Sequence, residues 1–127
     1  MIKYHLKNRV NPQDVTAVRK LYPVKKTQEQ LAMRDLAKRI SNESTISMMD
    51  TMAVLEAFLQ IIPSELLRGN IVKLGDFGTF RTTLSGVGVA TESEFNAATH
   101  IKNLNVRFRP AKEFKNLMLG VQYSKAP

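Results

Sequence analysis

The sequence predicts an α+β fold: two helices, a three-stranded antiparallel sheet with a protruding β-arm, and a short closing helix. Three observations predict it. A helix-capping pattern at residues 27–30 precedes apolar residues spaced with the period of a helix. Residues 52–67 are apolar around nearly the whole circumference of a second helix. Residues 103–109 alternate between apolar and polar or cationic side chains, as a half-buried strand does.

The first predicted helix begins after Thr27. The Thr27 hydroxyl can accept a hydrogen bond from the amide of Gln30, whose side chain can reach back to cap the helix. The helix is expected to end near Asn42. Its apolar face has the spacing i, i+3, i+4, i+7 and consists of Met33, Leu36, Ala37 and Ile40.

The second predicted helix leads us to expect a dimer. Ser47 is its expected N-cap, Asp50 suits its first turn, and Gly69 is its expected stop. Pro63 is expected to kink or restart it, because proline lacks the amide hydrogen. A helix that is apolar all round has to be buried on all sides, and the rest of this chain is too small to enclose it. We therefore expect an intertwined homodimer.

The remaining elements define three segments. Strands are expected at residues 71–74, 77–84 and 103–109, with a turn at 75–76 and a closing helix from Pro110. The expected domains are a basic N-terminal extension at residues 1–26, a nucleic-acid-binding domain at 27–119 and a loose tail at 120–127. Within the extension we expect an edge strand at residues 2–10, a turn at 11–14 and then an irregular segment.

The charge of the chain points to a polyanionic partner. The net charge is +8, and it is distributed unevenly. Residues 1–26 contain seven Lys or Arg and one Asp, residues 27–69 contain four bases and six acids, and residues 70–127 contain eight bases and four acids. Nucleic acid is the expected partner for such a distribution.

The candidate contact residues lie on the predicted sheet and the closing helix. Arginine suits phosphate because its guanidinium offers a planar fork of donors, and a helix N-terminus adds amide donors. The candidate DNA-binding residues are Lys73, Arg81, Asn103, Asn105, Arg107, Arg109, Lys112 and Lys115. The extension supplies auxiliary candidates, which are Lys3, Lys7, Arg9, Arg19, Lys20, Lys25 and Lys26.

Three segments in register resemble the HU/IHF family of bacterial histone-like proteins. They are residues 72–80 (VKLGDFGTF), residues 106–115 (VRFRPAKEFK) and the start of the second helix at residues 46–57. The resemblance covers roughly residues 27–118. It implies an obligate homodimer whose paired sheets form a saddle with two β-arms reaching around DNA. It also implies a cytoplasmic, nucleoid-associated protein that takes part in DNA condensation.

Two features depart from that family. The arm, residues 85–100, has no Lys, Arg or Pro and carries a charge of −2, whereas the family's arm is basic and has a wedging proline at its tip. Phe95 is an alternative apolar wedge or a packing residue. The extension is the second departure, and it has two open interpretations: an electrostatic clamp on DNA, or a strand that pairs with a sheet edge.

We expect a non-enzymatic, architectural DNA-binding protein with little sequence preference. The alternative is an HU-like protein-interaction module that binds DNA weakly or not at all. The chain has no cysteine, its histidines His5 and His100 lie far apart in sequence, and its glycines form no nucleotide-binding fingerprint. We therefore expect no catalytic residue, metal, cofactor or small-molecule substrate. No segment is apolar enough to predict a membrane span or signal peptide, so the cytoplasm is the expected compartment.

Overall fold

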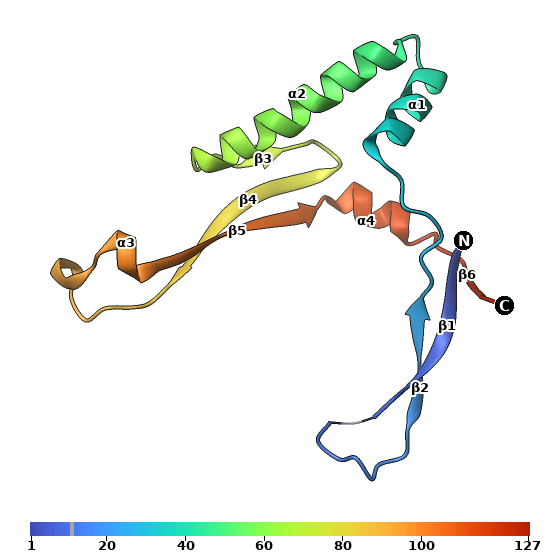
Figure 1. Cartoon of the computed structure of the whole chain (residues 1–127), viewed down its shortest axis with the longest axis horizontal. Coiled ribbons are helices and arrows are strands. Elements are labelled where there is room, and N and C mark those ends of the chain that lie inside the picture. The colour runs from blue at the N-terminus through green and yellow to red at the C-terminus, as the bar shows by residue number, and fades with distance from the viewer. Residues whose placement is uncertain (11) are drawn as a thin grey trace. The chain divides into compact units, whose positions relative to one another are not determined.

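A computed structural model describes residues 1–10 and 12–127, and it divides the chain into two compact units. One unit contains residues 33–117, and the other combines residues 1–32 with residues 118–127. Figure 1 labels the elements of both. No helix in the described part of the chain is long and apolar enough to cross a membrane.

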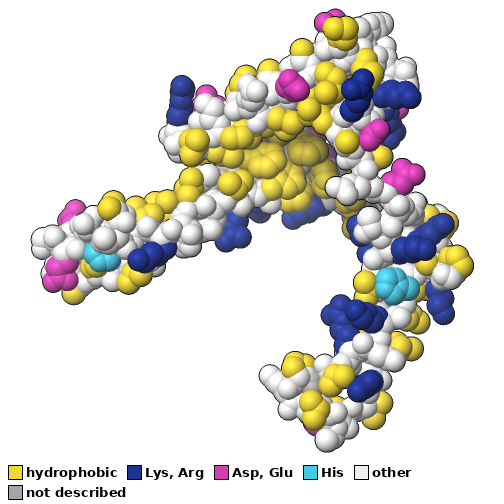
Figure 2. Space-filling model, in the orientation of Figure 1, with side chains coloured by type: hydrophobic (Ala, Val, Ile, Leu, Met, Phe, Trp, Pro, Cys, Tyr) yellow, Lys and Arg dark blue, Asp and Glu magenta, His cyan; other side chains and the backbone are white. Residues whose placement is uncertain are grey.

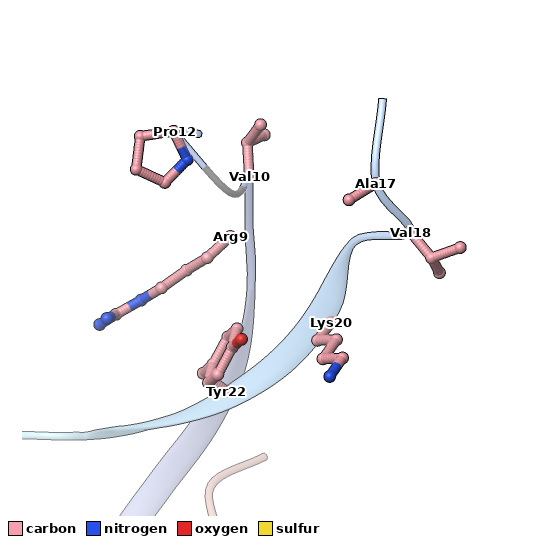
Figure 3. A pocket seen from close by; sticks show the side chains of 7 residues that line it. All are labelled: Arg9, Val10, Pro12, Ala17, Val18, Lys20 and Tyr22. Atoms are coloured by element: carbon pink, nitrogen blue, oxygen red, sulfur yellow. The ribbon is translucent and has the colours of Figure 1, made fainter. Parts of the chain in front are cut away.

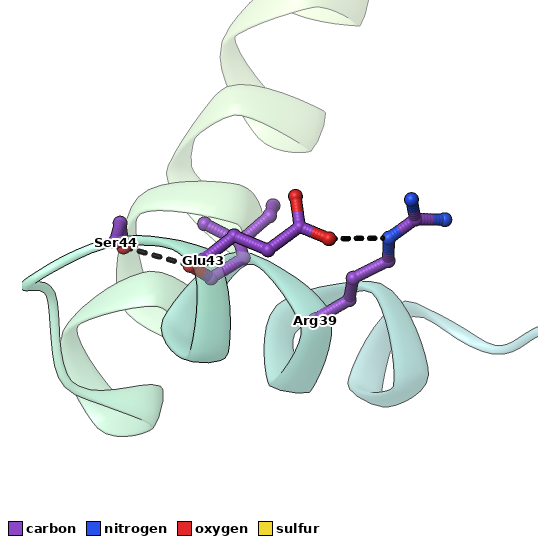
Figure 4. Close-up of polar contacts among 4 residues, drawn as sticks. Arg39, Glu43 and Ser44 are labelled. Carbon is purple, nitrogen blue, oxygen red and sulfur yellow. Dashed lines mark hydrogen bonds and ion pairs between the residues drawn. The ribbon is translucent and has the colours of Figure 1, made fainter.

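Two helices open the larger unit. Helix α1 spans Met33–Glu43 and packs against α2, which spans Met48–Leu67 (Figure 1). An ion pair of 2.9 Å joins Arg39 to Glu43 near the end of α1, and the Ser44 hydroxyl donates to the Ile40 carbonyl at 2.7 Å (Figure 4).

The start of α1 differs from the expectation. Residues 27–32 are not helical, so the predicted capping box at Thr27 does not begin the helix. These residues belong to the other unit, where the side-chain amide of Gln28 donates to the Met1 carbonyl at 3.1 Å. Helix α1 starts instead at Met33.

Both ends of α2 follow local capping chemistry. The Ser47 hydroxyl accepts from the Asp50 amide at 3.1 Å, which confirms the predicted N-cap. At the other end Gly69 has a φ of 84°, and its amide donates to the Leu66 carbonyl at 3.0 Å. This is a Schellman ending, in which the left-handed residue is glycine because a side chain would strain it. Helix α2 continues through Pro63, so the helix does not restart there.

The sheet of the larger unit has the strand order β3-β4-β5 and is antiparallel. Strand β3 is only Val72–Lys73, β4 is Gly78–Gly86 and β5 is Ile101–Pro110. Helix α4, Lys112–Met118, follows directly. It is held by aromatic packing, since the Phe114 ring meets the Phe77 ring edge-on at 5.2 Å between centroids.

The arm is a β-hairpin only at its base. Beyond β4 and β5 the chain forms the 3₁₀ helix η1, Glu92–Glu94, and the short helix α3, Ala97–His100 (Figure 1). Asn96 caps α3 by accepting from the Ala98 amide at 3.0 Å, and its own amide donates to Nδ1 of His100 at 2.8 Å. Asn96 therefore favours a helical turn where a plain β-arm was expected.

The smaller unit is a three-stranded sheet in the order β2-β1-β6. Strand β1 is Ile2–Arg9, β2 is Lys20–Lys25 and β6 is Tyr123–Lys125. The expected loose tail is therefore wrong in part: β6 runs parallel to β1 and fills its free edge. The irregular segment expected before Lys26 is also wrong over β2, which pairs antiparallel with β1. The turn expected at residues 11–14 begins at Asn11, which lies outside the described residues.

Few apolar side chains are buried within the single chain. Among the described residues, Ala37 and Leu66 are the buried hydrophobic ones. On α2, Val54 is 64% exposed and Ile61 is 58% exposed. Figure 2 shows hydrophobic side chains gathered between α2 and the sheet of the same unit, where Phe58, Ile62 and other residues line an open apolar hollow of about 670 Å³.

Candidate nucleic-acid interface

The register of the larger sheet separates an apolar face from a cationic face. Phe80 lies opposite Phe108 and Leu84 opposite Leu104, so these side chains share one face. The alternate residues lie on the other face, where Arg81 is directly opposite Arg107. The predicted alternation along residues 103–109 therefore describes β5 well.

A second row of the same face adds three more positions. Lys73 on β3 lies opposite Thr79 on β4, and Thr79 lies opposite Arg109 on β5. Further along the sheet, Asn105 and Asn103 lie opposite Thr83 and Ser85. The sheet thus brings together all six of its predicted contact residues, with Arg107 and Arg109 two positions apart on one strand.

Helix α4 adds the last two predicted residues beside this face. Lys112 and Lys115 line the same shallow depression, of about 390 Å³, as Arg81 and Arg109. The position of α4 follows from its aromatic packing and from a backbone bond at its start, in which the Ala111 amide donates to the Phe77 carbonyl at 3.1 Å. We name this surface the sheet cationic face. Its basic members are Lys73, Arg81, Arg107, Arg109, Lys112 and Lys115.

The charges of the sheet cationic face are not neutralised by the chain itself. Its six basic side chains are exposed. Ion pairs in the described part of the chain join Arg39 to Glu43 and Arg68 to Glu65, and neither involves this face. Two arginines directly opposite each other repel in the free protein. An anionic ligand that lies on this face removes that repulsion.

Sequence reasoning did not identify Thr79, Thr83 and Ser85 as members of this face. Their hydroxyls are hydrogen-bonding groups of the kind that contact phosphate oxygens. The sequence contained the signal, because Thr79, Arg81, Thr83 and Ser85 occupy every second position of β4. Asn103, Asn105, Arg107 and Arg109 are spaced in the same way along β5.

The arm has a different chemistry. Its tip has the acidic residues Glu92 and Glu94, and residues 85–100 contain no Lys or Arg. The ring of Phe95 stacks on His100 with 5.4 Å between centroids and is 45% exposed. Phe95 therefore packs against His100 within the tip and keeps part of its ring exposed.

The auxiliary candidates of the smaller unit divide between the two faces of its sheet. Lys3, Lys7 and Arg9 alternate along β1, and Lys20 lies directly opposite Arg9. Lys25 lies on the reverse face, opposite Tyr4. Arg19 and Lys26 lie just outside the ends of β2.

These features define a small α+β domain of the HU type: two helices, a three-stranded sheet with an extended hairpin, and a closing helix. The chain belongs to the HU-HIG family, described as an HU domain fused to wHTH, Ig, or glycine-rich motif, whose model matches residues 1–125. No curated protein matches the chain.

A solved structure is similar to the chain over almost its whole length. It is described as a candidate bacterial DNA-binding protein from Bacteroides vulgatus, and its TM-score is 0.67 at 14% sequence identity. The match covers 98% of this chain and 47% of that one, so this chain spans about half the length of its neighbour. At this identity the likeness shows the fold alone.

Proposed function

We propose that this protein is a non-sequence-specific, architectural DNA-binding protein of the histone-like kind, which acts as a homodimer and holds DNA through its phosphates. One observation carries the proposal: the sheet cationic face presents exposed lysine and arginine side chains in rows, with Arg81 opposite Arg107. Within the described chain, no carboxylate pairs with these side chains. Membership of an HU domain family and the description of the similar solved structure support it.

Phosphate is the ligand that this face suits best. Each arginine offers a fork of donors to anionic oxygens, and the threonine and asparagine side chains between them add neutral hydrogen bonds. Contacts to the DNA backbone position a protein without reading the bases, so binding of this kind has little sequence preference. A bacterial nucleoid is where such a protein would act.

A second copy of the chain is the proposed cover for α2. Apolar side chains such as Val54 and Ile61 are more than half exposed in one chain, and large exposed apolar surface is costly in water. A homodimer buries this surface and also doubles the number of cations offered to one duplex.

The acidic arm favours a second candidate function. An HU-like module that assembles with other proteins has no need of a basic arm, and residues 85–100 carry a charge of −2 with the partly exposed ring of Phe95. Retention on heparin that falls steeply with salt distinguishes the DNA-binding function from this one.

The test of the proposed site removes two phosphate contacts. Fluorescence anisotropy with a random-sequence duplex compares wild type with Arg107→Ala/Arg109→Ala. We expect the affinity to fall by about tenfold or more, equally on unrelated sequences, because backbone contacts are lost.

The matched control is Lys38→Ala/Arg39→Ala on α1, which also removes two positive charges from the same unit. This control should bind nearly as wild type does. If Arg107→Ala/Arg109→Ala binds as tightly as the control, the site assignment is wrong.

A further inference from the structure

The N-terminal hairpin carries a cationic face of its own. Alternate residues of β1 lie on the same face of the sheet, and on one face these are Lys3, His5, Lys7 and Arg9. The pairing with β2 adds Tyr22 opposite Lys7 and Lys20 opposite Arg9. We call Lys3, Lys7, Arg9 and Lys20 the hairpin cationic face.

The reverse face of the same hairpin is mainly apolar. Ile2, Tyr4 and Leu6 alternate along β1 there, and Pro23 and Tyr123 lie opposite Leu6 and Ile2. The two lysines on this face are Lys25 and Lys125, which both lie opposite Tyr4 on the neighbouring strands. The register therefore places four basic side chains on one face of this sheet and two on the other.

The bases of the hairpin cationic face have no acidic partner. All four side chains are exposed, and none takes part in an ion pair within the described residues. This unit contains only two side-chain carboxylates, those of Asp14 and Glu29. The Asp14 carboxylate accepts hydrogen bonds from the Thr16 hydroxyl and amide, and these bonds lower its pKa.

Tyr22 holds part of this face in place. The Arg9 guanidinium lies over the Tyr22 ring, 5.7 Å from its centroid. Arg9, Lys20 and Tyr22 border an open hollow of about 500 Å³ (Figure 3). Arg9 and Lys20 are directly opposite like charges, which repel unless an anion lies between them.

We infer that the hairpin cationic face is a second phosphate-binding surface, which contacts the backbone of the same DNA that the sheet cationic face is proposed to hold. The inference rests on the proposed function. Charge complementarity carries it: Lys3 to Arg9 extends over about 20 Å of strand, and duplex DNA of that length carries about twelve phosphate charges. A second surface on the same chain raises affinity because its encounter with the bound DNA is intramolecular.

The test compares the two faces of one hairpin at equal charge. Lys7→Ala/Lys20→Ala removes two positive charges from the hairpin cationic face, and Lys25→Ala/Lys125→Ala removes two from the reverse face. Binding to a random-sequence duplex is measured by fluorescence anisotropy at several salt concentrations, with circular dichroism and thermal melting to check folding. Lys3→Ala/Lys7→Ala replaces the first variant if that one does not fold.

We expect Lys7→Ala/Lys20→Ala to lose about tenfold in affinity and to reduce the slope of log affinity against log salt by about 1.8, at about 0.9 per phosphate contact. Lys25→Ala/Lys125→Ala should keep the wild-type slope. Equal losses in both variants would show that general charge, not this face, matters and would overturn the inference. So would wild-type binding by a folded Lys7→Ala/Lys20→Ala.

The variant Arg107→Ala/Arg109→Ala separates this inference from the proposed function. If it weakens binding while Lys7→Ala/Lys20→Ala does not, the hairpin surface is wrong and the sheet site stands. If Lys7→Ala/Lys20→Ala weakens binding and the arginine variant does not, the hairpin surface stands and the sheet site is wrong. If wild type binds no duplex at low salt, both are wrong.

Discussion

Arg81 on β4 lies directly opposite Arg107 on β5. Like charges directly opposite each other in an antiparallel sheet are destabilising. Arg9 and Lys20 repeat the arrangement in the smaller unit. At the scale of residues, repulsion in the free protein marks the places where an anion is expected.

The sequence identified Arg81 and Arg107 as candidate contact residues, but it did not predict that they lie opposite each other. The alternation of β5 was readable, because apolar and cationic residues follow each other along residues 103–109. Which residue of β4 lies opposite Arg107 depends on the register of the hairpin. Register follows from how the intervening segment turns, and that segment forms η1 and α3 instead of a simple β-turn.

At the scale of elements, strong local signals predicted the structure and long-range pairing did not follow from them. Ser47 and Gly69 mark the ends of α2 because each acts on its own backbone neighbours. The tail at Tyr123–Lys125 is different, because it becomes a strand only by pairing with β1 at the other end of the chain. A capping pattern at Thr27 misled for the same reason, since its segment belongs to the N-terminal unit.

The arm provides an element-scale prediction. Replacing residues 88–98 by a short turn should leave affinity for duplex DNA within about twofold of wild type, because that segment contributes no cation and carries a charge of −2. Anisotropy titration and thermal melting of the shortened protein test this. A loss of tenfold or more in a stably folded variant would mean that the arm grips DNA despite its charge.

At the scale of the whole molecule, one chain leaves most of its apolar surface uncovered. Only Ala37 and Leu66 are buried hydrophobic residues in the described part of the chain, although α2 is apolar around its circumference. Composition and periodicity predicted this imbalance. They could not predict which residues of a second copy would meet α2 in the proposed dimer, because such contacts lie between chains.

The proposed dimer makes a prediction at this scale. Ile61→Glu should abolish the dimer and unfold the chain, since an unpaired carboxylate buried at an interface costs several kcal/mol. Gln60→Glu, at the preceding position of α2, adds the same charge and should be tolerated. Sedimentation velocity and circular dichroism measure both. A folded Ile61→Glu monomer would show that this side chain faces water in solution.

The salt dependence of duplex affinity tests the central claim most directly. The proposed dimer offers twelve lysine and arginine side chains on its two sheet cationic faces. If only four of these side chains contact phosphates, the slope of log affinity against log salt is about −3.6. We predict a slope at least this steep, with the same value for two unrelated duplex sequences. An affinity that does not change with salt, or no binding at low salt, would contradict the claim that this protein holds DNA through its phosphates.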